Sequence, residues 1–291
     1  MRIKPIQILI LFFALLVVGF ITIFTVLKGK EKPANKEKSS FDENHNTPAP
    51  TITLTPTPKP LTFSEMNQRY GPCAIVPTLM YHHIQDEKNA KKLGQSNLSV
   101  DPQVFREHLT YLKDRGYKVI AMKDVIDFFA SGTPLPIKPA LLTFDDGYED
   151  FYFHAFPILK EFNYPATLFL PTGLVDNSGY LLWVEITEIS NSGLVLFANH
   201  TWSHQSTVSN KEVVEKEISL ADKQLLDRGL NKEKVFAYPY GSESQLAENY
   251  LRSLNYNLAF TTHIGNTLCK KLNLSLPRIR IGNVPLSVFG L

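Results

Sequence analysis

Two adjacent carboxylates, Asp145 and Asp146, directly follow an apolar run over residues 140–144. Neighbouring side chains on an extended chain point to opposite sides, so one carboxylate can ligate a metal while the other takes up a proton. Two buried carboxylates without a partner are unfavourable, and a nearby cation removes that penalty. We therefore expect a metal-dependent reaction centre here rather than an exposed Asp-Asp-Gly turn.

A pair of histidines supplies the remaining ligands of such a centre. His200 and His204 are four positions apart, a spacing that can place two imidazoles on one side of a turn. Together with Asp146 they provide two nitrogens and one oxygen, which leaves positions open for water and substrate, as in a catalytic zinc site. We expect a divalent metal, with Zn²⁺ preferred and Co²⁺ or Ni²⁺ able to use the same ligands.

The elements that must position these residues form an alternating pattern. Short β-rich apolar runs alternate with amphipathic helical segments, which is typical of an α/β protein with a mostly parallel sheet. The expected strands cover residues 75–82, 117–122, 140–146, 166–171, 194–200, 235–240, 258–263 and 278–281. Four of them finish in polar groups, at His82, Asp145, His200 and Tyr240. Because active sites of α/β barrels lie at the carboxyl ends of the strands, we predict a distorted seven- or eight-stranded (β/α) barrel.

Two of the expected helices have readable ends. Asp101 followed by Pro102 predicts an N-cap and a proline in the first turn, and Gly116 ends that helix. Ser209 and Glu212 have the spacing of a capping box for a second helix. That helix would bury one face, made of Val214, Ile218, Ala221 and Leu225.

The amino-terminal 60 residues differ in composition from the rest. Residues 6–27 form a run of 22 residues without a charge, long enough to span a bilayer. We interpret residues 1–30 as an uncleaved signal anchor, residues 31–60 as a linker rich in Pro and Thr, and residues 61–291 as the catalytic domain. Basic residues flank both ends of the run, so charge does not decide its orientation. The expected location is the cell membrane, single-pass, with the catalytic domain outside the cytoplasm.

Charge is also distributed unevenly. The formal net charge is +2, but residues 1–27 and residues 28–60 each contribute +2, which leaves −2 for residues 61–291. A nucleic-acid-binding protein would concentrate Lys and Arg on its folded part. The pattern therefore argues against a nucleic-acid partner and indicates the membrane as a partner of the first segment only.

Three motifs in a fixed order carry a family resemblance. The sequence TFDDG, then HTWSH, then FAYPYG resembles the polysaccharide deacetylase (NodB-homology) domain of carbohydrate esterase family four. LMYHHI near the start and LPRIRI near the end resemble the branch that contains the poly-N-acetylglucosamine deacetylases. The resemblance covers about residues 75–281.

The resemblance implies a role for each motif residue. Asp146, His200 and His204 would bind the metal, and Asp145 would be the general base that takes a proton from the attacking water. The backbone N–H of Tyr240 would help to hold the oxyanion. His82 would be the general acid that protonates the departing amine.

Two departures from the family pattern affect the mechanism. Ala237 stands where the family commonly has an Arg that pairs with the base, so either another cation, such as Arg278 or Arg280, orients Asp145, or the pKa of Asp145 is tuned differently. The late Leu-x-His motif is also missing. For that reason we place the acid at His82, with His263 as the alternative.

Other conspicuous side chains have open interpretations. Tyr148, Trp202 and Tyr238 are candidate substrate-binding residues because they stand in or beside the motifs, and Tyr180 and Trp183 are further aromatic candidates for sugar stacking. His83 should face away from His82 and is expected to be structural. The only two cysteines, Cys73 and Cys269, could form a disulfide or remain two buried thiols.

The expected function is metal-dependent removal of acetyl groups from N-acetylglucosamine units of an extracellular or cell-wall polysaccharide, with poly-β-1,6-N-acetylglucosamine as the first choice. Peptidoglycan and chitooligosaccharides are alternative substrates, and acetylated xylan is a weaker one. A non-catalytic carbohydrate-binding protein on the same fold is the alternative from another class, motivated by the missing Arg. The sequence does not predict an oligomeric state.

Overall fold

The computed structural model describes residues 60–291, which belong to a compact unit that begins at Lys59. The predicted anchor over 1–30 and the predicted linker over 31–60, apart from its last residue, lie outside the described residues. Within residues 60–291, none of the helices is both long and apolar enough to cross a membrane.

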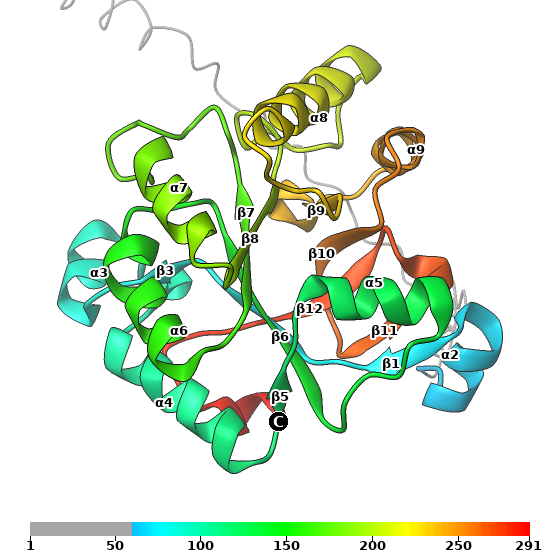
Figure 1. Cartoon of the computed structure of the whole chain (residues 1–291), viewed down its shortest axis with the longest axis horizontal. Helices are drawn as coiled ribbons and strands as arrows, with labels where there is room; N and C mark the ends of the chain where they lie inside the picture. The colour runs from blue at the N-terminus through cyan, green and yellow to red at the C-terminus, as the bar shows by residue number, and fades with distance from the viewer. Residues whose placement is uncertain (1–59) are drawn as a thin grey trace, which may run out of the picture. The chain divides into compact units, whose positions relative to one another are not determined.

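Seven parallel strands close into a barrel, with helices outside them (Figure 1). The ring closes because β2 pairs with β6 as well as with β12. In order round the ring the strands are β2 (Thr78–Tyr81), β12 (Leu276–Arg280), β10 (Leu258–Ile264), β9 (Val235–Ala237), β8 (Val195–Asn199), β7 (Ala166–Leu170) and β6 (Pro139–Asp145). The prediction of a seven- or eight-stranded (β/α) barrel is confirmed with seven strands in the ring.

The eighth predicted strand lies outside this ring. β5 (Lys118–Val119) pairs with only the first two residues of β6, whose later residues pair with β2. It is also much shorter than the predicted range 117–122, because α5 (Met122–Ser131), with its N-cap at Ala121, begins at the end of that range. β5 therefore extends the sheet at one edge of β6 without taking part in the closure.

The first predicted strand is divided in two. β1 (Cys73–Ile75) pairs antiparallel with β11 (Thr267–Cys269), and β2 starts only at Thr78. Pro77 lies between them and has no N–H to continue a hydrogen-bonded ladder, which explains the break. A disulfide joins Cys73 and Cys269 across the β1–β11 pair, so the disulfide is the alternative that the structure adopts for the two cysteines.

The helix predictions are mostly confirmed. α4 (Pro102–Asp114) is capped by Asp101, whose carboxylate accepts from the N–H of Gln103. α8 (Lys211–Leu226) buries the predicted face, but its N-cap is Asn210, whose side chain accepts from the N–H of Val213. The predicted Ser209 capping box was therefore wrong by one position, since an Asn side chain satisfies the same N–H.

The remaining elements connect the strands. The other helices are α2 (Phe63–Tyr70), α3 (Glu87–Leu93), α6 (Phe156–Phe162), α7 (Trp183–Asn191) and α9 (Gln245–Ser253). β3 (His83–Ile84) and β4 (Ser99–Val100) form a small parallel pair. Single helical turns occur at η1 (Ser96–Leu98), η2 (Phe151–Ala155), η3 (Pro239–Gly241), η4 (Lys270–Leu272) and η5 (Leu286–Phe289).

Alternate residues of the barrel strands belong to different apolar clusters. Leu141 and Phe169 lie in one cluster with residues of β8, β9, β10, β12 and α5, while their neighbours Leu142 and Leu168 lie in another with residues of α4, α6 and α7. This alternation follows from the two-residue period of a strand. Asp145, four positions after Leu141, therefore shares the side of β6 that faces the first cluster, inside the barrel.

Candidate active site

The predicted site residues meet at the carboxyl ends of the barrel strands. The register places Asp145 of β6 opposite Phe169 of β7, and Leu170 of β7 opposite Asn199 of β8. His200 follows Asn199 directly, so the Asp-Asp and His motifs lie on nearly the same level of the barrel. These motifs lie more than 50 residues apart in the sequence, and the parallel pairing of β6, β7 and β8 brings them close together in space.

Asp146, His200 and His204 form a compact cluster of potential ligands. One ligand atom from each residue lies within 4.8 Å of the others. The Nε2 atoms of His200 and His204 lie 3.3 Å and 3.0 Å from Oδ1 of Asp146. The geometry brings together the three residues that the sequence indicated as a metal site.

The polar atoms of this cluster fit a bound cation. The Nδ1–H of His200 donates to the carbonyl of Ala237 over 2.7 Å, so in the neutral imidazole Nε2 carries a free lone pair. Oδ1 of Asp146 is buried and has no hydrogen-bond partner among the described residues. Lone pairs that converge in this way repel one another unless a positive charge lies between them, and His and Asp are ordinary zinc ligands.

The electrostatics of the cluster favour the ionised forms of Asp146 and His200. Burial opposes ionisation of Asp146, but the imidazoles of His200 and His204 hold the pKa of its carboxyl well below the usual value. Burial alone would lower the pKa of His200, yet Asp146 and Asp145 raise it. Both shifts arise from the attraction between the Asp146 carboxylate and positive charge beside it.

Asp146 and the loop that carries the histidines have unusual backbone geometry. Asp146, Thr201 and His204 all have positive φ values, of 76°, 67° and 61°. Non-glycine residues adopt this region at a cost and keep it when their surroundings hold them there. A buried glutamate of α8 provides part of that support: Glu217 accepts from the N–H of Ser203 over 2.7 Å and from its hydroxyl over 2.8 Å.

The base candidate Asp145 is held by Arg278. Two guanidinium nitrogens of Arg278 donate to the two carboxylate oxygens of Asp145, each over 2.7 Å. Arg278 is fully buried, and its Nε–H donates to the carbonyl of Thr261. Burial would raise the pKa of Asp145, but the charge of Arg278 and of the neighbouring imidazoles lowers it overall. Arg278 thus supplies the cation that is missing at Ala237, so that departure no longer favours a non-catalytic protein.

The two acid candidates have different surroundings. His82 follows the last residue of β2, and burial lowers the pKa of its imidazole, although the nearby charges of Asp145 and Asp146 oppose that effect. His263 lies near the end of β10 with 65% of its side chain exposed and with Glu243 3.9 Å away. Of the two, His82 is the one placed beside both motif carboxylates.

The three predicted substrate-binding residues are placed differently. Tyr238 is 1% exposed and donates to the carbonyl of Leu274, so it cannot contact a polysaccharide, and that assignment was wrong. The ring of Tyr238 packs among apolar side chains between the barrel and the helices, and its hydroxyl has a hydrogen-bond partner. Trp202 is partly buried, and its carbonyl accepts from the N–H of Gly173. Tyr148 is partly exposed, and its ring stacks on that of Tyr180.

Tyr240 lies at the rim of the site. Its φ is 60°, inside the turn η3, and its ring contacts that of His204 edge-on, with the ring centres 4.7 Å apart. The side chain is 68% exposed. The predicted role of Tyr240 concerns its backbone N–H, and the structure places this residue next to the metal-ligand candidates.

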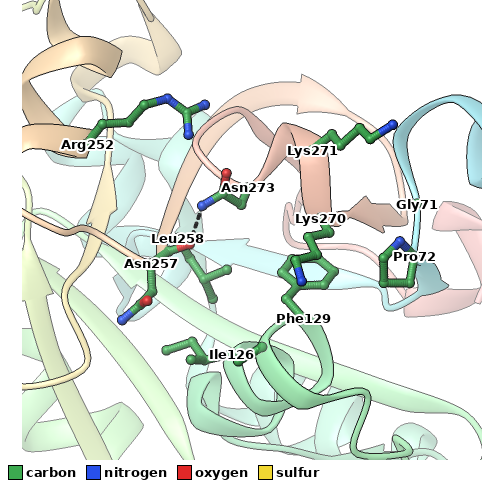
Figure 2. A pocket seen from close by; sticks show the side chains of 11 residues that line it. Gly71, Pro72, Ile126, Phe129, Arg252, Asn257, Leu258, Lys270, Lys271 and Asn273 are labelled. Atoms are coloured by element: carbon green, nitrogen blue, oxygen red, sulfur yellow. Dashed lines mark hydrogen bonds between the residues drawn. The ribbon is translucent and has the colours of Figure 1, made fainter.

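A large cavity of the described body lies at the other end of the barrel. Its volume is about 720 Å³, and Leu258, the first residue of β10, is among its lining residues. Figure 2 shows Lys270, Lys271 and Arg252 around an apolar floor made by Ile126 and Phe129. It contains none of the predicted site residues, so size alone does not identify the reaction centre.

Comparisons with known proteins show which family the chain resembles. The sequence profile described as "Polysaccharide deacetylase" matches residues 132–259. The structure is similar to the Streptococcus pyogenes deacetylase PplD in complex with acetate, with a TM-score of 0.65 and 32% identity, covering 71% of this chain and 92% of that one. It is also similar to IcaB from Ammonifex degensii, with a TM-score of 0.64 and 25% identity, covering 74% and 94%.

A curated relative has a more specific name. The poly-β-1,6-N-acetyl-D-glucosamine N-deacetylase of Escherichia coli (strain K12) is 28% identical over 251 residues, which cover 71% of this chain. The chain spans about a third of that relative's length, 36%. The chain belongs to the polysaccharide deacetylase family, a family of hydrolases.

Proposed function

We propose that this protein removes acetyl groups from N-acetylglucosamine units of a polysaccharide, with poly-β-1,6-N-acetylglucosamine as the substrate. One observation carries the proposal: an Asp-His-His ligand cluster lies next to a carboxylate held by a buried arginine, at the mouth of the barrel. The name of the Escherichia coli relative supports the choice of polymer.

Asp146, His200 and His204 would hold the divalent metal, for which we propose Zn²⁺ because two imidazoles and one carboxylate suit it. When bound, such a cation supplies Lewis-acid chemistry, activating water and polarising a carbonyl oxygen. The hydrogen bond from His200 to Ala237 fixes the ring so that Nε2 remains the ligand atom.

The other residues would move protons. A carboxylate oxygen of Asp145 takes a proton from the attacking water as the oxygen of that water bonds to the acetamide carbon. Because Arg278 keeps Asp145 ionised, this base is ready at neutral pH. The backbone N–H of Tyr240 donates to the developing oxyanion, and an imidazole nitrogen of His82 gives a proton to the amine as the carbon–nitrogen bond breaks. The products are acetate and a sugar with a free amine.

We also propose that residues 1–30 anchor the protein in the cell membrane with the catalytic domain outside the cytoplasm. The support is the uncharged run of 22 residues and the disulfide between Cys73 and Cys269, since disulfides persist in oxidising compartments. Digestion of intact cells with an external protease should release the folded domain. A domain that is protected until the cells are lysed would contradict this location.

The function is tested by measuring acetate release from poly-β-1,6-N-acetylglucosamine, peptidoglycan, chitooligosaccharides and acetylated xylan. We expect the first polymer to be the best substrate and chelator to abolish release. Faster release from peptidoglycan or chitooligosaccharides would overturn the substrate, and metal-loaded protein that releases acetate from none of the four would overturn the function.

A further inference from the structure

A second cavity, of about 610 Å³, adjoins the reaction centre. Its lining comes from the segments after β2, β6 and β7, the first two of which also carry His82 and Asp146. Tyr148 is part of its wall and stands two residues after the ligand candidate Asp146. A polymer bound with one unit at the ligand cluster would place a neighbouring unit in this cavity.

The cavity is lined by acidic residues. Asp86, Glu149 and Asp150 are among the lining residues, which include no Lys or Arg. Asp86 caps α3 and accepts from the N–H groups of Lys88 and Asn89. Glu149 is exposed and has no ion pair within residues 60–291. Several negative charges around one cavity attract a cationic ligand.

A buried histidine in the same wall has an unused polar atom. His83 is 5% exposed, and its Nδ1 lies 2.5 Å from a carboxylate oxygen of Asp150. Asp150 also accepts from the N–H of Ile84, so its position is fixed from two sides. Nε2 of His83 has no hydrogen-bond partner among the described residues. Since buried polar atoms are almost always satisfied, this atom indicates a polar ligand group.

Aromatic faces complete the wall. The rings of His83 and Tyr148 are stacked with their centres 3.6 Å apart, and Tyr148 stacks in turn on Tyr180, 5.4 Å away. Phe153, also in the lining, is 58% exposed. Flat apolar faces next to polar atoms suit a pyranose ring, which has an apolar C–H face and a rim of hydroxyl groups.

We propose that this cavity is a subsite for a sugar unit with a free, protonated amine, that is, a glucosamine unit of the same polymer. A neutral N-acetylglucosamine unit has no charge for the carboxylates of Asp86 and Glu149 to attract. The proposed reaction itself makes glucosamine units, so this inference rests on the proposed function for its ligand. The enzyme would then act preferentially beside units that have already lost their acetyl group.

The test is a binding measurement that requires no turnover. The full chain is titrated calorimetrically with a β-1,6-linked glucosamine tetramer and with the matching N-acetylglucosamine tetramer, at a pH where the amines are protonated. We expect the glucosamine tetramer to bind more tightly. In the double variant Asp86→Asn, Glu149→Gln its affinity should fall roughly tenfold, as expected for two partly exposed charge pairs.

The two substitutions, Asp86→Asn and Glu149→Gln, are chosen so that the fold should stay intact. Asn at position 86 retains an oxygen to cap α3, and Glu149 makes no ion pair in the described part of the chain. Glu107→Gln, an exposed change on α4 outside this cavity, is the matched control and should leave binding unchanged. Equal binding of the two tetramers, or a double variant that binds like the control, would overturn the subsite.

The acetate assay separates the two proposals. Charge-dependent glucosamine binding in a protein that releases no acetate would leave the subsite in place and remove the proposed function. Acetate release together with equal binding of both tetramers would support the proposed function and overturn the subsite. In an active enzyme, a substrate with one glucosamine neighbour should show a lower KM than the fully acetylated oligomer, and the double variant should lose that difference.

Discussion

Arg278 and Asp145 form a buried ion pair with two parallel hydrogen bonds, although they lie 133 positions apart in the chain. The guanidinium comes from β12 and the carboxylate from β6, and β2 lies between these two strands in the barrel. A planar fork of donors matches a carboxylate in a way that a lysine cannot. The pair therefore fixes both the charge and the direction of the proposed base.

Replacing Arg278 should affect activity and stability separately. Arg278→Lys keeps a positive charge but loses the fork, so we expect kcat to fall by about 10- to 100-fold with a smaller effect on KM. Arg278→Met leaves a buried carboxylate without a partner and should lower the free energy of unfolding by about 3–5 kcal/mol. Acetate-release kinetics and denaturant unfolding measure the two effects. Arg280→Lys, at the exposed end of β12, is the control, and an equal loss there would contradict the assignment.

The two adjacent aspartates should respond differently to the same change. Asp145→Asn removes the proposed base but no ligand, so turnover should fall by about 100-fold or more while the bound metal remains. Asp146→Asn removes a charged ligand atom and should reduce both the metal content and turnover. Metal analysis of the purified variants, together with the acetate assay, distinguishes the two roles. Loss of metal from Asp145→Asn with retention in Asp146→Asn would reverse the two roles.

Glu217 should support the metal site from a distance. Its carboxylate accepts both the N–H and the hydroxyl of Ser203, next to His204 in the chain. Glu217→Gln exchanges one acceptor for a donor, so we expect about 10-fold weaker metal binding and a loss of about 1–3 kcal/mol of stability. Metal titration followed by thermal unfolding checks both. The exposed change Glu212→Gln on the same helix should affect neither quantity.

His108 should make the fold sensitive to acid. Its Nε2–H donates to the carbonyl of Val284, its Nδ1 lies 3.2 Å from the hydroxyl of Tyr81, and burial lowers the pKa of the imidazole below its ordinary 6.5. The unfolded state therefore takes up a proton before the folded state does. Stability should fall as the pH drops below 6.5 and stop falling below the folded-state pKa.

Thermal unfolding over a pH series tests this. His108→Gln should reduce the acid sensitivity, whereas His154→Gln, at an exposed histidine, should leave it unchanged. An unaltered pH dependence in His108→Gln would show that other groups cause the acid sensitivity.

Much of the site could be predicted because its chemistry is local in sequence. The Asp-Asp pair and the His-x3-His spacing indicate a ligand set without any knowledge of the fold, and the cluster of Asp146, His200 and His204 confirms that these residues meet. The assignment of Tyr238 failed because motif membership does not show whether a side chain faces the barrel mouth or the helix layer. His83 was expected to be structural, and its pairing with Asp150, 67 residues away, has no local signal.

The sequence by itself determined the order of strands and helices, the residue types of the candidate metal centre and the apolar faces that build the barrel, because each depends on periodicity or spacing along a short segment. Only the tertiary structure decided which cation faces Asp145, that Cys73 and Cys269 are joined, and that three carboxylates surround the cavity beside Tyr148. These are contacts between distant segments. They depend on strand register and barrel closure, which no single stretch of the chain encodes.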